Sequence, residues 1–248
     1  MIVSKVYNWL QNSTSIEIHC LLCRGKAQWQ TPICDFCLDS CSIPEWFCSL
    51  CGLPFHDASQ ENETGLCNRC IHQAPVFDVC LSAYLYEYPI NAIIQRVKYQ
   101  RRLELIKPIT RRLSDTLRDY YLNKPWPETL IPIPLHNKRL RERGYDQALL
   151  LAKAITRQIR DNAPTALDTH ILKRTRATPP QQGLNARARR KNIKHAFSLQ
   201  RGCNYKHVAL IDDVVTTGET VSEATRLLKK SGIRQVDIWC LARTPQAD

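Results

Sequence analysis

The sequence predicts an α/β domain, with a mainly parallel sheet flanked by helices, preceded by a small Cys-rich module. Ten of the twelve cysteines lie between Cys20 and Cys80. From residue 78 onward, apolar and β-branched runs alternate with helical stretches, which is the pattern of a parallel sheet. We therefore expect an N-terminal helix or tail over residues 1–15, the Cys-rich module over 16–77 and the α/β domain over 78–248.

The elements of the α/β domain follow from its hydrophobic runs. Strands are expected over 79–86, 129–134, 169–173, 207–212 and 235–242, and helices near 90–98, 104–121, 145–160 and 219–231. The 207–212 run, HVALID, is apolar at every position except its ends, which is typical of a strand covered on both faces. This run is therefore predicted to lie in the middle of the sheet.

Four C-x-x-C pairs follow one another in the Cys-rich module. Two thiolates separated by two residues can bind one tetrahedral metal ion from a tight turn, and two such turns complete a closed structural site. Eight ligands therefore predict two zinc ions, bound either by consecutive pairs or by interleaved pairs. The predicted ligands are Cys20, Cys23, Cys34, Cys37, Cys48, Cys51, Cys67 and Cys70.

The absence of an export signal favours metal ligation over disulfides. The start, MIVSKVYNWLQNSTS, lacks an apolar segment and a cleavage site, and no apolar run approaches the ~18 residues of a membrane span. We therefore expect a cytoplasmic protein without an integral membrane segment. A reducing cytosol keeps thiols free for metal, and four pairs in series fit structural zinc better than a redox-active pair.

Charge divides the chain at the same place as the cysteines. Residues 1–80 hold four Lys/Arg and eight Asp/Glu, so that 31 of the 35 basic and 15 of the 23 acidic residues fall in 81–248. This excess indicates a polyanionic partner, such as a phosphorylated substrate or nucleic acid, or a basic surface that keeps the protein in solution.

The segment after the predicted central strand combines two carboxylates with a phosphate-type loop. Asp212 and Asp213 end the strand, and residues 216–220 (TTGET) then open a helix. Backbone N–H groups, hydroxyls and the helix N-terminus converge there, and Gly218 lets the backbone approach an anion closely. Ligands of open α/β folds bind at the carboxyl ends of strands. The loop therefore predicts a phosphate site, with the carboxylates free for sugar hydroxyls or magnesium; the alternative is that the acidic pair only caps the helix.

This combination resembles the phosphoribosyl pyrophosphate (PRPP) loop of type I phosphoribosyltransferases. The resemblance implies a type I phosphoribosyltransferase-like domain that binds PRPP with Mg²⁺. In it, the acidic pair would contact the ribose hydroxyls and the turn would hold the 5-phosphate. The implied PRPP-binding residues are Asp212, Asp213, Thr216, Thr217, Gly218, Glu219, Thr220, Lys98 and Tyr99.

Two further segments are strongly basic. Arg139, Arg141 and Arg143 form a cationic turn ahead of the 145–160 helix, and their guanidinium groups suit the phosphates of PRPP or of nucleic acid. Residues 173–194 hold eight Lys/Arg, no acidic residue, and three Pro/Gly, which predicts a mobile loop. Its cations Arg187, Arg189 and Arg190 are further candidates for phosphate or DNA contact.

Several short motifs occur in the order found in the ComF competence family. They are IQRVKY (94–99), IPIPLH (131–136), RLRERGYDQ (139–147) and QGL (182–184), and the zinc module fits as well. The chain therefore resembles this family from about residue 20 to residue 243. One departure is the sequence Gln100-Arg101-Arg102, where a glycine often follows the Lys-Tyr pair, so that no pyrophosphate loop is predicted there.

The resemblance implies a double zinc ribbon over 16–77 fused to the phosphoribosyltransferase-like domain. It also implies a competence-associated, PRPP-binding protein that handles single-stranded DNA in the cytoplasm during natural transformation and DNA uptake. Other competence or DNA-processing proteins would dock on the zinc module. The alternative is an active phosphoribosyltransferase that uses Mg-PRPP on an unidentified acceptor, for which no catalytic residue is assigned.

Overall fold

The computed structural model describes residues 18–27, 31–55, 64–177, 193–200, 202 and 204–245. The chain divides into two compact units, Met1–Ser40 and Cys41–Asp248. The helix or tail expected over 1–15 lies outside the described residues, as do Arg187, Arg189 and Arg190 of the basic loop. None of the helices in the described part combines the length and the apolar character that crossing a membrane requires.

The described residues of the first unit, 18–27 and 31–40, form tight turns and the short helix α2 (Asp35–Asp39). Cys20 donates its N–H to the Gly25 carbonyl at 2.7 Å, which closes a turn, and α2 follows Cys34 directly. In the part of this unit that the structure describes, the buried side chains are Cys20, Ile33 and Cys37. Because so little apolar surface is buried here, a bound metal would supply much of the stability of this unit.

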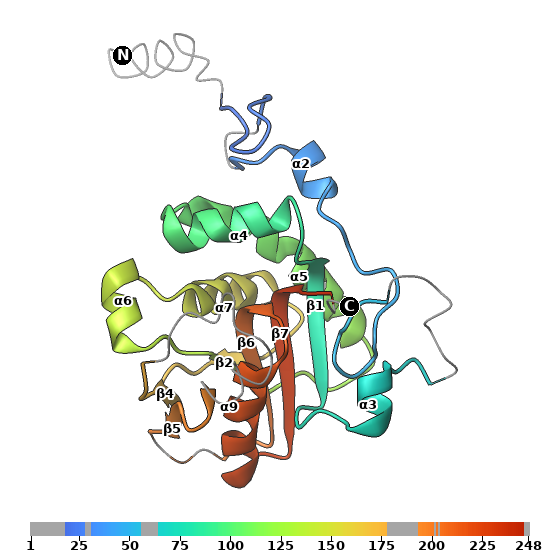
Figure 1. The fold of residues 1–248 in the computed structure, drawn as a ribbon, viewed down its shortest axis with the longest axis vertical. Coiled ribbons are helices and arrows are strands. Elements are labelled where there is room, and N and C mark those ends of the chain that lie inside the picture. Colours follow the sequence, from blue (N-terminus) through green and yellow to red (C-terminus); the bar gives the residue numbers. More distant parts are fainter. Residues whose placement is uncertain are drawn as a thin grey trace, which may run out of the picture. The chain divides into compact units, whose positions relative to one another are not determined.

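The second unit contains a five-stranded parallel sheet with the order β1-β7-β6-β2-β3 (Figure 1). Its strands are β1 (Val79–Leu85), β2 (Thr129–Pro132), β3 (Ala166–Leu167), β6 (His207–Val215) and β7 (Gln235–Arg243). The apolar run of β6 is fully buried, and this strand lies in the middle of the sheet, between β7 and β2, as the sequence predicts.

Helices cover both faces of this sheet. On one face α5 (Ile106–Tyr120) packs against β1 and β7, and α7 (Gln147–Gln158) packs against β6 and β2. On the other face α9 (Glu219–Lys230) packs against β6 and β7, as Figure 1 shows. In the described part of this unit the remaining helices are α3 (Asn68–His72), α4 (Ile90–Tyr99), the 3-10 turn η2 (Leu103–Leu105) and α6 (Asn137–Arg143).

Several elements differ from the sequence prediction. The strand expected over 169–173 is β4 (Leu172–Arg174), which pairs antiparallel with β5 (Phe197–Leu199) in a separate two-stranded sheet. The basic segment expected to be a turn is the helix α6, which begins where the His136 ring accepts a hydrogen bond from the Lys138 N–H and ends at Gly144, at φ 86°. The missed edge strand β3 has only two residues and no apolar run, so the sequence contains little signal for it.

The second Cys-rich segment is part of the body that contains the sheet. Cys48, Cys51, Cys67 and Cys70 pack in the same core as residues of β1, β6 and α9. The Cys80 N–H of β1 donates to the Leu50 carbonyl at 2.8 Å. A Cβ at Gly52 would lie 2.6 Å from the Cys80 carbonyl oxygen, so only glycine allows this approach. The two Cys-rich segments thus fall in different compact units, while the domain limits at 16, 77 and 248 stay a prediction.

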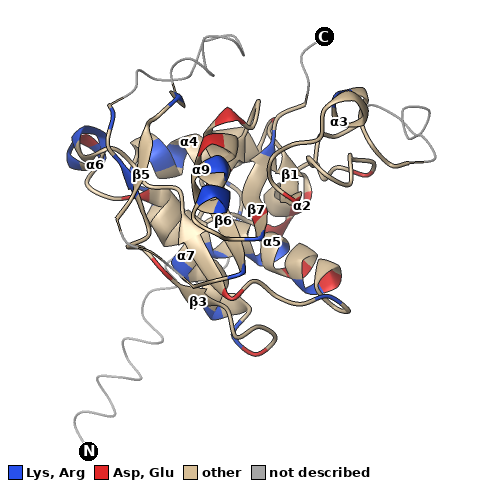
Figure 2. Ribbon diagram, turned by 90° about the horizontal axis from the view of Figure 1, so that it is seen from below, with Lys and Arg blue, Asp and Glu red and all other residues tan. Residues whose placement is uncertain are grey.

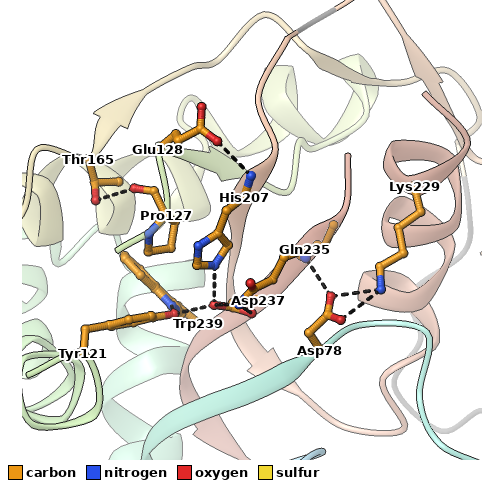
Figure 3. Close-up of polar contacts among 11 residues, drawn as sticks. Asp78, Tyr121, Pro127, Glu128, Thr165, His207, Lys229, Gln235, Asp237 and Trp239 are labelled. Atoms are coloured by element: carbon orange, nitrogen blue, oxygen red, sulfur yellow. Dashed lines mark hydrogen bonds and ion pairs between the residues drawn. The ribbon is translucent and has the colours of Figure 1, made fainter. Parts of the chain in front are cut away.

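A buried polar network ties the amino-terminal ends of β6 and β7 to the end of α5 (Figure 3). The Tyr121 hydroxyl donates to the Asp237 carboxylate at 2.6 Å and accepts from the Trp239 indole N–H at 3.1 Å. His207 Nε2 lies 2.7 Å from the same carboxylate. Asp237 is fully buried, and these partners satisfy its charge away from water.

Candidate functional site

The acidic pair lies near the end of β6, which extends beyond the predicted strand to Val215. Asp213 is buried and Asp212 is half-buried. After Val215 the chain turns through Thr216 and Thr217 to Gly218, the N-cap of α9, which has the left-handed φ of 78°. An L side chain would be strained at that φ, so the turn that opens the helix depends on this glycine. The residue pattern thus places two carboxylates and a helix N-terminus at one edge of the sheet.

A cavity of about 390 Å³ opens at this edge of the sheet. Every residue that the resemblance assigns to PRPP binding lines it. These residues are Lys98, Tyr99, Asp212, Asp213, Thr216, Thr217, Gly218, Glu219 and Thr220. They come from α4, β6, the loop after β6 and the start of α9, so that segments more than a hundred residues apart meet at one cavity.

Lys98 of α4 forms an ion pair with Asp213, its Nζ lying 2.8 Å from Oδ2. The Lys98 side chain is 19% exposed and the Asp213 side chain 8%. Burial disfavours the charged ammonium, but the charge and hydrogen bond of Asp213 together with the charge of Asp212 outweigh this effect, so the pKa of Lys98 is raised above its usual value. The cavity therefore contains a charged lysine that is held by one member of the acidic pair.

The pKa of Asp212, unlike that of Lys98, lies near neutral pH. Burial, followed by the negative charge of Asp213, raises the pKa of Asp212 from 3.8 to about 7. Its Oδ1 accepts a hydrogen bond from the Asp213 N–H at 2.9 Å. At neutral pH this carboxyl is thus poised between its two protonation states, and a bound cation would favour the ionised form.

The three arginines of α6 divide between two faces of the helix. Arg139 and Arg143, four residues apart, are half-buried and line the cavity. Arg141 is exposed on another side of the helix, and Figure 2 shows the basic character of α6. Arg143 also lies over the Tyr99 ring, 5.5 Å from its centroid. The structure therefore brings two of the three candidates to the cavity.

Arg174 is a lining residue that the sequence reasoning did not separate from the basic loop. It is 9% exposed, and burial together with the neighbouring charge of Arg139 lowers its pKa. The signal that would have found it is the alternation in β4, where Leu172 and Arg174 face inward and Lys173 faces solvent. A buried arginine at a cavity is well suited to bind a phosphate oxygen.

The cysteines form two clusters of four, made by consecutive pairs. One contains Cys20, Cys23, Cys34 and Cys37, and the other Cys48, Cys51, Cys67 and Cys70. Within each cluster the sulfur atoms lie within 4.8 Å of one another. The structure thus brings together the consecutive pairs rather than the interleaved ones.

The sulfur geometry fits a tetrahedral zinc ion. The Sγ atoms of Cys23 and Cys34 are 3.6 Å apart, and those of Cys51 and Cys67 are 3.7 Å apart. Four sulfurs at a zinc–sulfur distance of about 2.3 Å would be separated by ~3.8 Å, whereas a disulfide requires ~2.0 Å. The Leu22 N–H also points to Cys20 Sγ at 3.4 Å, which stabilises a thiolate. Each cluster could therefore hold one zinc ion in a closed structural site.

One thiol of the second cluster is strongly acidic. The hydrogen bond from the Cys51 thiol lowers the pKa of Cys48 from 9.0 to about 4. In the first cluster, burial opposes ionisation of Cys20, but the backbone N–H groups of Cys23, Cys34 and Leu22 outweigh it and lower the pKa to about 6. Each cluster thus offers at least one thiolate at neutral pH, which is the form that binds metal.

A model of the phosphoribosyl transferase domain matches residues 146–248, which include β6, the loop after it and α9. Together with the parallel sheet, this match defines the second unit as a type I phosphoribosyltransferase fold.

Competence protein F of Haemophilus influenzae is 35% identical over 92% of this chain and 97% of its own length. DNA utilization protein YhgH of Escherichia coli K12 is 32% identical over 91% of this chain and 96% of its own. Competence protein ComFC of Bacillus subtilis is 26% identical over 95% of this chain and all of its own length. The chain belongs to the ComF family.

Proposed function

We propose that this protein is a competence-associated PRPP-binding protein that handles single-stranded DNA in the cytoplasm during natural transformation. The observation that supports PRPP binding best is the cavity in which an acidic pair, a phosphate-type loop and several cations meet. Its volume of about 390 Å³ falls in the range of small-molecule sites.

The cavity offers a distinct group for each part of Mg-PRPP. The 5-phosphate would bind at residues 216–220, where the loop and the N-terminus of α9 present N–H and hydroxyl donors. Asp212 and Asp213 would contact the ribose hydroxyls and the Mg²⁺. Arg139, Arg143 and Arg174 supply cations for the diphosphate. Magnesium would neutralise part of the diphosphate charge.

The proposed DNA interface begins on the outer face of α6. Lys138 and Arg141 are exposed there, and Lys173 of β4 is exposed as well. Such cations bind the nucleic-acid backbone without regard to sequence. The names of the relatives, competence protein and DNA utilization protein, support a role with DNA. α6 would thus face PRPP with one side and DNA with the other.

The zinc module would serve as a docking element for other competence or DNA-processing proteins. The module contains the two clusters of four cysteines. In the first unit, the side chain of Phe36 of α2 is 77% exposed. An exposed aromatic ring between two zinc ligands offers apolar area for such a contact.

Calorimetric titration with PRPP and Mg²⁺ tests the PRPP site. We expect saturable binding by the wild type and its loss in Asp212→Asn/Asp213→Asn. The matched control is Asp115→Asn/Asp119→Asn, which removes two exposed carboxylates from α5 and should bind as the wild type does. A wild type without binding would contradict the proposal.

Fluorescence anisotropy with a labelled oligothymidine tests the DNA interface. Affinity should fall steeply with salt, and Lys138→Ala/Arg141→Ala should reduce the slope of log K against log salt by about 1.4, which corresponds to two phosphate contacts. Arg139→Ala/Arg143→Ala should instead lose PRPP affinity. A response that is flat with salt would contradict DNA binding through these cations.

An active phosphoribosyltransferase is the second candidate, because the chain keeps both carboxylates and the complete loop at the cavity. Such an enzyme would replace the pyrophosphate at the ribose anomeric carbon by an acceptor. Release of pyrophosphate from Mg-PRPP in the presence of a panel of nucleobases would show it, if Asp212→Asn/Asp213→Asn abolishes the release. Equal release by wild type and variant would exclude this activity for those acceptors.

A further inference from the structure

Arg243, the last residue of β7, connects the second Cys-rich segment to the phosphate loop. Its guanidinium is buried, with the residue 4% exposed. Nε donates to the Cys51 carbonyl at 3.1 Å, and Nη1 donates to the Val215 carbonyl at 2.9 Å and to the Thr216 carbonyl. A single planar group therefore bridges the backbone of a zinc ligand and the start of the loop.

Arg69 makes a parallel connection from the fourth C-x-x-C pair. It lies between Cys67 and Cys70, and its Nη1 donates to the Thr217 carbonyl at 3.3 Å. Arg69 and Arg243 thus bind the carbonyls of three successive residues, namely Val215 at the end of β6 and Thr216 and Thr217 of the loop.

Peptide geometry gives this arrangement a consequence for the cavity. In a planar trans peptide, the C=O of one residue and the N–H of the next point in opposite directions. Carbonyls 215 to 217 face the arginines, so the N–H groups of Thr216, Thr217 and Gly218 are directed away from them. These three residues line the cavity, and successive N–H groups of this kind bind anions.

The second cluster itself is rigidly joined to the sheet. Its four cysteines are 0–8% exposed and share a core with Phe77, Val215 and Val221. The Leu50 carbonyl accepts from the Cys80 N–H of β1, and Gly52 packs directly on the same strand. A metal that fixes these four thiolates would therefore also fix the atoms from which Arg69 and Arg243 hold the loop.

We infer that the second cysteine cluster positions the phosphate loop through Arg69 and Arg243, so that metal binding at this cluster and phosphate binding at the loop favour each other. This inference rests on the proposed PRPP site. Coupling between two sites is reciprocal: if the metal strengthens PRPP binding, PRPP must strengthen metal binding by the same factor. The first cysteine cluster lies in the other compact unit and serves as the internal reference.

The zinc-loaded full-length protein provides the test. Zinc release to an excess of a metallochromic chelator is followed with and without saturating Mg-PRPP. One of the two zinc equivalents should leave at least about threefold more slowly with the ligand, and the other should leave at the same rate. In Asp212→Asn/Asp213→Asn, for which we expect no ligand binding, neither rate should change.

Arg69→Ala separates positioning from folding, because this side chain is exposed and its loss leaves the core intact. We expect its Kd for PRPP to rise about threefold to tenfold, as for the loss of one hydrogen bond, with weaker protection of zinc. The matched control is Phe36→Ala, at the equivalent position of the first cluster, which should behave as the wild type.

Two results would overturn the inference and leave the proposed function intact. One is PRPP binding by the wild type with no change in either zinc release rate. The other is an Arg69→Ala protein whose PRPP affinity and zinc protection equal those of the wild type. A wild type that binds no PRPP would overturn the proposed function itself.

Discussion

Lys98 and Asp213 form a 2.8 Å ion pair between α4 and the end of the central strand. The same carboxylate is a proposed contact of the ribose and Mg²⁺. Ligand binding must therefore rearrange this pair, by releasing the ammonium to a phosphate oxygen or by sharing the carboxylate. Lys98 thus compensates the negative charge of the acidic pair until Mg²⁺ arrives with the ligand.

Lys98→Met should destabilise the protein at pH 8 by about 2–4 kcal/mol, because the two carboxylates lose their buried cation. The loss of stability should become smaller toward pH 5, because the acidic pair takes up a proton there. Urea unfolding at both pH values measures it. Lys229→Met is the matched control: Lys229 and Asp78 form an equally short but more exposed pair (Figure 3), so the cost there should be below about 1 kcal/mol. Equal costs for both variants would contradict this account of Lys98.

Asp212→Asn should stabilise the protein above pH 7 while abolishing PRPP binding. The pKa of Asp212 is about 7 in the folded chain, against 3.8 ordinarily, so the folded state holds an extra proton between these values. The contribution of Asp212 to the free energy of unfolding is therefore most favourable below pH 3.8 and is lost as the pH rises to 7. Removing the carboxyl should add on the order of 1–3 kcal/mol at pH 8 and little at pH 4. Thermal melts at the two pH values measure the difference, and a variant less stable than the wild type at pH 8 would contradict it.

The two cysteine clusters should differ in their effect on the main fold. Cys67→Ser removes a ligand from a cluster within the core of the sheet-containing unit, and we expect loss of its cooperative unfolding. Cys34→Ser removes a ligand of the first cluster and should leave that transition intact. The fluorescence of the buried Trp239 reports the transition, and metal analysis should give one zinc ion per chain for Cys34→Ser. A Cys67→Ser protein that melts as the wild type does would contradict the proposed difference.

Tyr121→Phe should destabilise the fold without affecting the cavity. It leaves a buried carboxylate oxygen and an indole N–H without the hydroxyl that joins them, at a cost of about 1–3 kcal/mol. The network lies toward the amino-terminal ends of β6 and β7, whereas the cavity lies at the carboxyl ends. Asp237 pairs with Ala209, three residues or ~10 Å along β6 from Asp212 of the cavity. Urea unfolding should show the loss, and PRPP titration should not change. A weaker PRPP affinity would contradict the separation of the two regions.

Local patterns predicted the central strand and the cysteines that the structure groups in two clusters. They also predicted the phosphate loop, which stays a prediction. Each of these depends on residues close together in sequence, so the hydrophobic run of β6 and the spacing of C-x-x-C pairs carried the information. The family resemblance added Lys98 and Tyr99, which the fold brings to the same cavity.

Features that depend on contacts between residues far apart along the chain could not be predicted from the sequence. Arg243 ends a hydrophobic strand and gives no local sign that its guanidinium reaches Cys51, 192 residues away. In the sequence, Arg174 is one of eight cations in a basic stretch. Only the structure shows that its side chain faces inward from β4. Within the segment Gln100-Arg101-Arg102, where family members often have a glycine, Arg101 adopts the left-handed conformation, with φ 56°.

The place of β7 in the sheet has a consequence for biosynthesis. β1 is an edge strand whose neighbour is β7, and β7 also lies beside β6. During synthesis, β1 and the four cysteines of the second cluster therefore leave the ribosome long before β7, the sheet partner of β1, is made. Only when residues 235–243 emerge can β1 join the sheet and Arg243 reach the Cys51 carbonyl. Until then the growing chain presents an unpaired strand edge and reactive thiols, so a chaperone or early metal insertion would protect it most during this interval.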